Sequence, residues 1–216
     1  FVDGLAKHLE KNGVRLIKND CVSGFRVQGN KVVGVRTKSG DYVADEFVLA
    51  GGSWSPDIVR DLGIKLLVQA GKGYSVTIPK KKTSPAIPLI FSEARVAVTP
   101  MGETIRFAGT MEIAGLDLSI TRRRVDAIIN SIPDYIGGFE KPDFEDVKPW
   151  AGLRPVSPDG LPYIGRFKAY SNLIAATGHA MIGMSLAPVT GKLVADIATS
   201  AQPSIDLSLL DPDRFN

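Results

Sequence analysis

The chain of 216 residues is poor in the side chains that build metal sites and disulfide frameworks. Its single cysteine, Cys21, excludes an intramolecular disulfide and a zinc site made of several cysteines. Its two histidines, His8 and His179, form no HExxH or His-x-His motif. We therefore expect no structural or catalytic metal.

Long apolar runs and dense charge are scarce as well. No run approaches the roughly 18 apolar residues that cross a bilayer. The net charge is only +3, and the basic runs Lys80–Lys82 and Arg122–Arg124 have no aromatic stacking platform beside them, so we expect no nucleic-acid partner. Hydrophobic residues make up 44% and charged residues 23%, which excludes a collagen-like, coiled-coil or disordered chain.

The first 65 residues alternate between helix and strand patterns. Apolar spacings of three and four over Phe1–Asn12 predict an amphipathic helix that Gly13 ends. A short strand is expected at Val14–Ile17. Turn residues separate the next three predicted strands, and the third leads into a buried strand that ends at Gly51 and Gly52 before a helix near Pro56. These strands are Val22–Val27, Lys31–Thr37 and Tyr42–Leu49.

Residues 66–149 have a different pattern, typical of an antiparallel sheet followed by a helix at Thr121–Ser131. The predicted strands are Tyr74–Ile78, Arg95–Thr99 and Thr104–Gly109. Residues 150–216 return to α/β character, with a strand at Asn172–Ala176 and a helix at Leu186–Thr199. The sequence thus predicts an α/β (α+β) fold in which a sheet domain, 66–149, is inserted between 1–65 and 150–216.

Three segments are candidates for a binding site. In the first, Val48–Ser55, an apolar strand ends in Gly51 and Gly52, which lets a ligand approach bare backbone at the carboxyl end of a strand. An ordinary turn from strand to helix would have the same residues.

The second segment, Gly152–Pro162, contains one arginine, Arg154, in a loop that its prolines are expected to stiffen. If this guanidinium group is buried, a planar carboxylate that accepts two parallel hydrogen bonds is its natural partner. The alternative is a surface arginine paired with Asp159 or Glu145.

The third segment, Thr177–Met184, lies between a buried strand and the last helix. Its backbone N–H groups and the positive end of that helix can stabilise negative charge on a ligand. His179 either faces such a ligand or is a core histidine bonded to a backbone carbonyl oxygen.

In this order and spacing, the segments resemble the C-terminal half of FAD-dependent D-amino acid dehydrogenases, in the superfamily of glycine oxidase, sarcosine oxidase and D-amino acid oxidase. The most specific matches are Trp150–Pro155 with Pro158–Gly165, and Thr177–His179 with Leu186–Gly191. Lys72–Ser75 and Arg106–Glu112 add to the resemblance. It implies part of a Rossmann-like FAD/NAD(P)-binding domain that carries an inserted substrate domain.

The resemblance also implies roles for individual residues. Arg154 matches the arginine that binds the substrate carboxylate, and Tyr74 is expected to line the same pocket. The positions that match FAD contacts are Val22 for the adenine, Ala50, Gly51, Gly52 and Trp54 for the ribose and pyrophosphate, and Gly178, His179, Ala180, Met181, Ile182, Gly183 and Met184 for the isoalloxazine. No residue is assigned as a general base.

The implied reaction is oxidative deamination of a D-amino acid, with hydride passing from Cα to FAD and a quinone or carrier as the later electron acceptor. The implied location is the cytoplasm, where a quinone acceptor would fit a peripheral association with the membrane. Related enzymes of hydroxyproline, sarcosine or glycine, and a non-catalytic ligand-binding domain, are the alternatives.

The family's GxGxxG fingerprint is absent, and Gly71-Lys72-Gly73 does not have its spacing. We therefore expect this chain to be a fragment that needs an N-terminal half, and that by itself binds FAD poorly and has no activity. We also expect Arg154 and the Thr177–Met184 turn to face one shared cavity.

Overall fold

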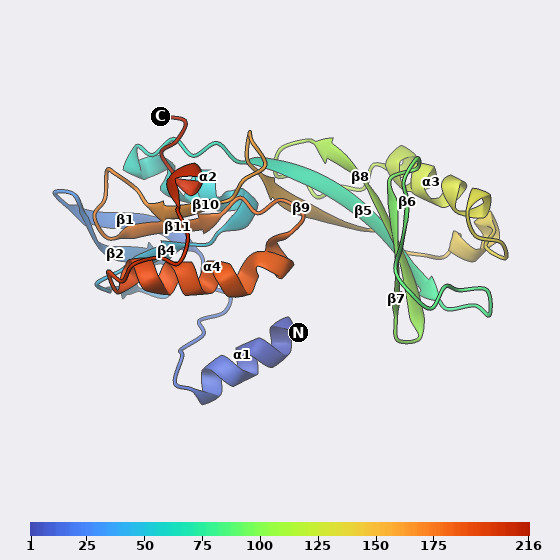
Figure 1. Ribbon diagram of the computed structural model, residues 1–216, viewed down its shortest axis with the longest axis horizontal. Helices are drawn as coiled ribbons and strands as arrows, with labels where there is room; N and C mark the ends of the chain where they lie inside the picture. The colour runs from blue at the N-terminus through green and yellow to red at the C-terminus, as the bar shows by residue number, and fades with distance from the viewer.

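The computed structural model describes all residues, 1–216, and forms an elongated molecule with a sheet-rich module at either end (Figure 1). In the first module, β1 (Val22–Gln28), β2 (Lys31–Thr37) and β3 (Asp41–Tyr42) form an antiparallel meander. A second sheet has the order β10-β11-β4, in which β4 (Phe47–Leu49) runs parallel to β11 (Leu173–Thr177) and β10 (Tyr163–Arg166) runs antiparallel to it.

Asn172 fastens these two small sheets together. Its side-chain amide nitrogen donates to the carbonyl oxygens of Val32 (2.8 Å) and Asp45 (2.9 Å), and its amide oxygen accepts from the Val32 N–H at 2.9 Å. The side chain is buried, and its two bonds to Val32 satisfy backbone groups that water does not reach. Helix α4 (Gly183–Ala198) packs on β10 and β11, with Leu193 buried beneath it.

The second module is a five-stranded antiparallel sheet in the order β6-β7-β8-β5-β9. Helix α3 (Arg122–Ser131) covers one face and buries Val125, Ile128 and Ile129, because these residues recur every three or four positions. The strands are β5 (Gln69–Pro79), β6 (Leu89–Phe91), β7 (Val96–Met101), β8 (Thr104–Ile113) and β9 (Trp150–Val156).

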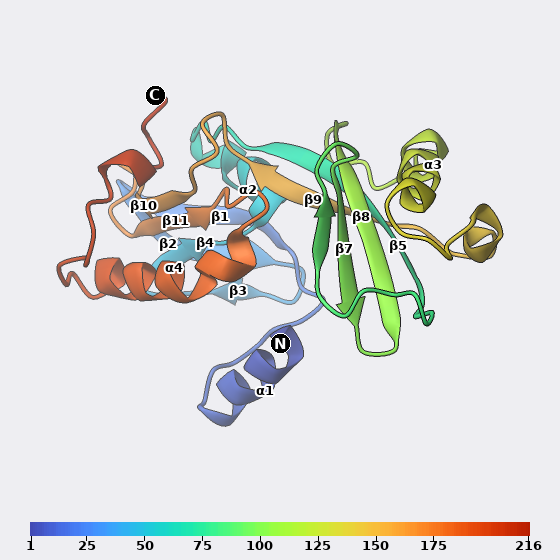
Figure 2. The ribbon, with the colours of Figure 1, turned by 45° about the vertical axis from the view of Figure 1, so that its right-hand side comes forward.

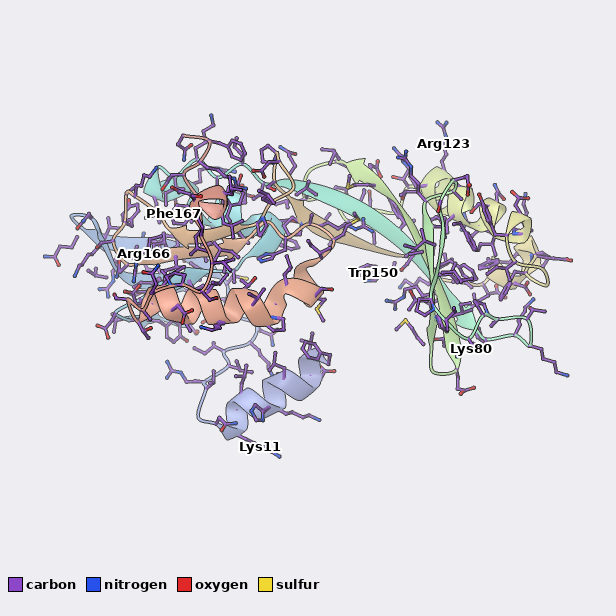
Figure 3. All side chains as sticks on the ribbon, viewed as in Figure 1. Lys11, Lys80, Arg123, Trp150, Arg166 and Phe167 are labelled. Carbon is purple, nitrogen blue, oxygen red and sulfur yellow. The ribbon has the colours of Figure 1, made fainter.

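Strands β5 and β9 also join the two modules, since this pair extends from the sheet toward the small sheets (Figures 1 and 2). Trp150 lies between the modules, whereas Lys80 and Arg123 lie apart from each other in the second one (Figure 3). The two basic runs of the sequence therefore do not adjoin. None of the helices combines the length and the apolar character that crossing a membrane requires.

The mixed helix-and-sheet class predicted from the sequence is confirmed. The predicted strand at Val14–Ile17 is wrong: no strand of the chain pairs with this segment, and Val14 and Ile17 are exposed. Helix α1 (Val2–Lys11), which precedes it, buries none of its residues and stands apart from the sheets (Figure 2).

Two other expectations change in detail. The predicted strand Tyr42–Leu49 divides into β3 and β4, which belong to different sheets, and a short helix, α2 (Ser55–Val59), follows β4. The predicted stiff loop around Arg154 begins as strand β9, because its backbone pairs with β5 from Gln69 to Ser75. The predicted boundary at residue 150 thus falls at the start of a strand of the five-stranded sheet. The three-part division stays a prediction.

Candidate functional site

The ends of two parallel strands form the centre of the candidate site. Because β4 and β11 are parallel neighbours, the turns that follow them, at Gly51 and at Gly178, lie at the same edge of the sheet. Buried hydroxyl groups link the turns: Ser55 Oγ donates to Thr177 Oγ1 at 3.1 Å, and Thr177 Oγ1 donates to the Gly52 carbonyl oxygen at 3.2 Å. The two predicted turns are thereby held as one unit.

A hollow of about 300 Å³ lies on one side of the β4 end and is almost entirely apolar. It brings together three predicted cofactor residues, Val22, Ala50 and Gly51. Its other lining residues are Phe25, Val35, Phe47, Val48, Leu49, Ile58 and Leu173. The sequence did not indicate this hollow as a unit, because its walls come from four strands and a helix.

A second hollow, of about 360 Å³, lies at the turn between β11 and α4. Ala50 lines both hollows, so together they form one surface that runs from Val22 to the start of α4. The second hollow is lined by Ala50, Gly52, Pro155, Ala176, Thr177, Gly178, His179, Ala180, Met181, Gly183 and Met184. Of the predicted cofactor residues, Ile182 and Trp54 line neither hollow, and both are about half exposed.

Two glycines in these turns are required for different reasons. Gly178 has φ of +82°, and a Cβ there would lie 2.9 Å from a ring carbon of Tyr163. Gly52 has φ of +55°, but a Cβ there would meet no atom within 4 Å. The first glycine is needed for packing as well as for the turn, whereas a side chain at the second would project into open space at the hollow.

His179 is held by a neighbouring helix rather than by a backbone carbonyl oxygen. Its Nε2 lies 2.9 Å from Thr190 Oγ1 in α4, and burial lowers the pKa of the imidazole. Burial thus favours the neutral imidazole, and its Nε2 forms a hydrogen bond with the threonine hydroxyl. This contact fixes the orientation of the histidine at the hollow. A purely structural role, in packing the turn against α4, would account for the same contact.

Arg154 lies on the face of the five-stranded sheet opposite α3. Its guanidinium group extends over Gly73, where a Cβ would collide with it, and its Nη1 donates to the Thr110 carbonyl oxygen at 3.4 Å. Burial lowers the pKa of the group, but an arginine stays charged at neutral pH. No carboxylate pairs with it.

The alternative pairing with Asp159 is wrong, because Asp159 accepts from Arg214 instead, with Nε to Oδ2 at 2.9 Å. Glu145 forms no ion pair with Arg154 either. A hollow of about 200 Å³ adjoins the guanidinium group and contains no acidic residue. Its lining residues are Gly73, Tyr74, Ser75, Arg106, Ala108, Trp150, Gly152, Leu153 and Arg154.

Tyr74 lines this hollow, yet its phenol group faces away from Arg154. Neighbouring residues of a strand point to opposite faces, and Arg154 lies over the adjacent Gly73. Tyr74 is only 1% exposed, lies in the core beneath α3, and donates its hydroxyl to Glu112. The structure therefore gives the hydroxyl a protein partner instead of a place in the pocket.

The Thr177–Met184 turn and Arg154 are neighbours, although they line separate hollows. The Ala180 N–H donates to the Pro155 carbonyl oxygen at 2.8 Å, and Val156 forms a β-bridge with His179. The expected single cavity is thus wrong for this chain taken by itself. Arg154 nevertheless lies one residue from the contact that joins β9 to the turn.

Sequence reasoning missed the charged network behind Arg154. Lys72 is 1% exposed and is bound by Asp117, Glu112 and the Ser119 carbonyl oxygen. A signal was present: Lys72 stands between two glycines just before the predicted strand Tyr74–Ile78, and a lysine needs acidic partners if it is buried.

Comparisons with known proteins find related sequences and similar folds. The chain matches the DAO family, described as FAD dependent oxidoreductase, over residues 1–197. It is 38% identical over 220 residues to the D-amino acid dehydrogenase of Bradyrhizobium diazoefficiens and 36% identical over 217 residues to that of Agrobacterium fabrum. Each alignment covers 100% of this chain and 51% of the relative, so the chain spans about half the length of these curated relatives.

Solved structures show the same fold. Glycine oxidase from Geobacillus kaustophilus superposes with a TM-score of 0.87 at 24% identity, over 99% of this chain and 57% of that one. L-proline dehydrogenase from P. horikoshii superposes with a TM-score of 0.86 at 25% identity, over 99% of this chain and 58% of that one.

Proposed function

The chain belongs to the DAO family of FAD-dependent oxidoreductases, and on that premise we propose that the protein oxidises D-amino acids to imino acids, which hydrolyse to oxo acids and ammonia. The names of the relatives at 38% and 36% identity support the choice of substrate. The observation that carries the proposal is Arg154, a half-buried guanidinium group with no carboxylate partner, next to the glycine turns at the ends of β4 and β11.

The residues at these strand ends fit FAD. Gly52 leaves open space where a side chain would stand, and the neighbouring Ser53 has a buried Oγ without a hydrogen-bond partner in the protein. A buried hydroxyl group of this kind needs a partner, which a polar ligand at the strand end would supply. The apolar hollow that contains Val22 suits a flat ring such as adenine.

We assign the ribose and pyrophosphate to Ala50, Gly51 and Gly52, and the isoalloxazine to the Gly178–Met184 turn. When bound, FAD accepts the two electrons that leave the substrate as a hydride. The start of α4 contributes backbone N–H groups and the positive end of the helix dipole, which stabilise negative charge nearby.

Arg154 binds and orients the substrate. Its guanidinium group donates two parallel hydrogen bonds to the carboxylate, which fixes the direction of Cα relative to the turn that Pro155 and Ala180 join to β9. The hollow beside Arg154 has no acidic residue, and we assign no general base, because an amine that binds neutral has no proton to lose before the hydride leaves.

The test is turnover of a panel of D-amino acids, with glycine, sarcosine and hydroxyproline, by the protein expressed from its complete gene with an artificial dye as acceptor. We expect Arg154→Ala to raise KM by about thirtyfold or more, since loss of a buried charged contact removes about 2–5 kcal/mol. Arg123→Ala, an exposed arginine of the same module, is the control and should leave KM unchanged. An unchanged KM in Arg154→Ala would remove Arg154 from its role, and absence of turnover would favour a non-catalytic binding domain.

A further inference from the structure

We propose that Lys72, Tyr74 and Glu112 form a positioning device for Arg154: they fix a bulge in β8 whose Thr110 carbonyl oxygen holds the guanidinium group. The inference rests on the proposed function, because it assigns these residues to binding of the same carboxylate. It also changes the predicted role of Tyr74 from a direct contact to an indirect one.

The three residues lie together on the buried face of the sheet. Lys72 and Glu112 are directly opposite each other on β5 and β8, with Nζ 3.8 Å from Oε2, and Tyr74 donates its hydroxyl to the same Oε2. Lys72 also donates to Asp117 at 2.9 Å, and Thr121 Oγ1 donates to Glu112 at 3.3 Å. Glu112 thus receives contacts from β5 and from Thr121, the residue that precedes α3.

Charge keeps the network ionised at neutral pH. The hydrogen bond from Tyr74 and the positive charge of Lys72 lower the pKa of Glu112, and the bond to Asp117 raises the pKa of Lys72. A carboxylate is a stronger acceptor than a carboxylic acid, so the contact from Tyr74 is a charge-assisted hydrogen bond.

The bulge lies between the two cross-strand pairs that this network fixes. Lys72 pairs with Glu112, and Tyr74 pairs with Gly109, so Thr110 and Met111 of β8 together oppose the single residue Gly73 of β5. Thr110 has φ of +60°, a conformation that disfavours a β-branched residue. Such a conformation persists only where its surroundings hold it, and here Tyr74 and Lys72 hold the strand on either side.

The opposite face of the same bulge holds Arg154. The guanidinium group lies over Gly73, the residue that the bulge opposes, and donates to the Thr110 carbonyl oxygen at 3.4 Å. This oxygen is the protein's one hydrogen-bond acceptor for the group. The register of β5 and β8 therefore decides where the guanidinium group points.

The test uses Tyr74→Phe in the protein from the complete gene, with Tyr135→Phe as the matched control. Tyr135 also donates its hydroxyl to a glutamate, Glu93, but at a site away from the bulge. We expect Tyr74→Phe to raise the Kd of propionate, measured by calorimetry, and the KM for the D-amino acid about three- to tenfold, which corresponds to about 0.7–1.4 kcal/mol of binding free energy. The value of kcat should change less than about twofold.

A second variant, Thr110→Gly, separates positioning from stability. Glycine adopts positive φ without strain, and the Thr110 hydroxyl has no partner to lose, so the fold should keep its melting temperature. The bulge becomes free to move, and we expect the same rise in the Kd of propionate. If this Kd stays at the wild-type value in Thr110→Gly, or in a folded Tyr74→Phe, the proposal is overturned.

The outcome also separates this inference from the proposed function. A wild-type protein that oxidises no amino acid, but binds propionate in a manner that Arg154→Ala abolishes, would refute the oxidation while the two variants still test the positioning. Propionate binding that Arg154→Ala leaves unchanged would overturn the positioning role directly.

Discussion

Residues in the turn between β11 and α4 determine the shape of the candidate site. Gly178 has positive φ, its Cα faces the ring of Tyr163, and Arg214 stacks on that ring with its Cζ 3.9 Å from the ring centroid. A side chain at position 178 would therefore push against the Tyr163 ring and so disturb the contact of that ring with Arg214.

We expect Gly178→Ala to lower the free energy of unfolding by about 1–3 kcal/mol, because the new methyl group meets both an unfavourable φ and the Tyr163 ring. Urea denaturation measures it. Gly191→Ala is the control: this glycine is exposed in α4 with open space around its Cα, so alanine there should raise the free energy of unfolding by about 0.5–1 kcal/mol. A Gly178→Ala protein as stable as the wild type would contradict the packing described for the turn.

For single residues, the sequence predicted which side chains belong to the candidate site better than it predicted what they contact. Arg154 could be singled out because one arginine stands among prolines and glycines, and it does lack a carboxylate partner. The direction of Tyr74 could not be predicted, because it depends on the register of β5 against β8 and on the bulge at Thr110. The partner of His179 is 11 residues away in α4, and the sequence does not indicate it.

Elements meet at the site through the parallel pair β4 and β11, which lie far apart in the chain. Thr177 Oγ1 is the buried atom that connects their two turns, as it accepts from Ser55 and donates to the Gly52 carbonyl oxygen. One buried hydroxyl group therefore links the two turns of the proposed FAD-binding surface, in addition to the pairing of β4 with β11.

Thr177→Val removes this hydroxyl group without changing the size of the side chain. We expect the Kd of FAD, measured by flavin fluorescence with the protein from the complete gene, to rise about fivefold or more, since two buried polar groups lose their partner. Thr104→Val, which removes a hydroxyl group bonded to Met101 in the other module, should leave the Kd unchanged. If the Kd of FAD is the same in the two variants, the hydrogen bonds of Thr177 do not contribute to cofactor binding.

Local patterns predicted most elements but not their partners. The helix at Thr121–Ser131 was predicted, because helical periodicity is a property of the segment alone. Strand character at Val14–Ile17 was predicted wrongly and at Trp150–Val156 was missed, because a strand forms only where another strand pairs with it. The three prolines and two glycines after Trp150 concealed the pairing with β5.

At the scale of the whole molecule, the C-terminal segment packs against the connection between β9 and β10. Arg214 donates to both carboxylate oxygens of Asp159 at 2.9 Å and to the carbonyl oxygen of Leu161 at 2.8 Å. Its side chain is largely buried between Asp159 and the Tyr163 ring. This contact couples the end of the chain to the segment that follows Arg154.

The ion pair predicts a pH-dependent contribution to stability. The hydrogen bond from Arg214 lowers the pKa of Asp159 from 3.8 to about 2 in the folded protein. Because the folded state favours the ionised form, the stabilisation is complete above the unfolded pKa and is lost as the pH falls through about 2. Since Asp159 is partly exposed, we expect Asp159→Asn to cost about 1–2 kcal/mol at pH 6.

Urea denaturation from pH 6 down to pH 2 tests the sign. The difference between wild type and Asp159→Asn should shrink steadily below pH 4. In an Arg214→Met background the same substitution should have little effect at any pH, because the partner is gone. A difference that is constant with pH would show that Asp159 acts through something other than its charge.

The β5–β9 ribbon that joins the two modules has a mechanical consequence. The two residues that follow Arg154 contact the turn through their backbone. Pro155 accepts a hydrogen bond from Ala180, and Val156 forms a β-bridge with His179. If the ribbon bent nearer Trp150, or the five-stranded sheet moved with α3, Arg154 would still be one residue away from these contacts with the turn. The distance between Arg154, the proposed carboxylate-binding residue, and the turn is thus set by local backbone contacts.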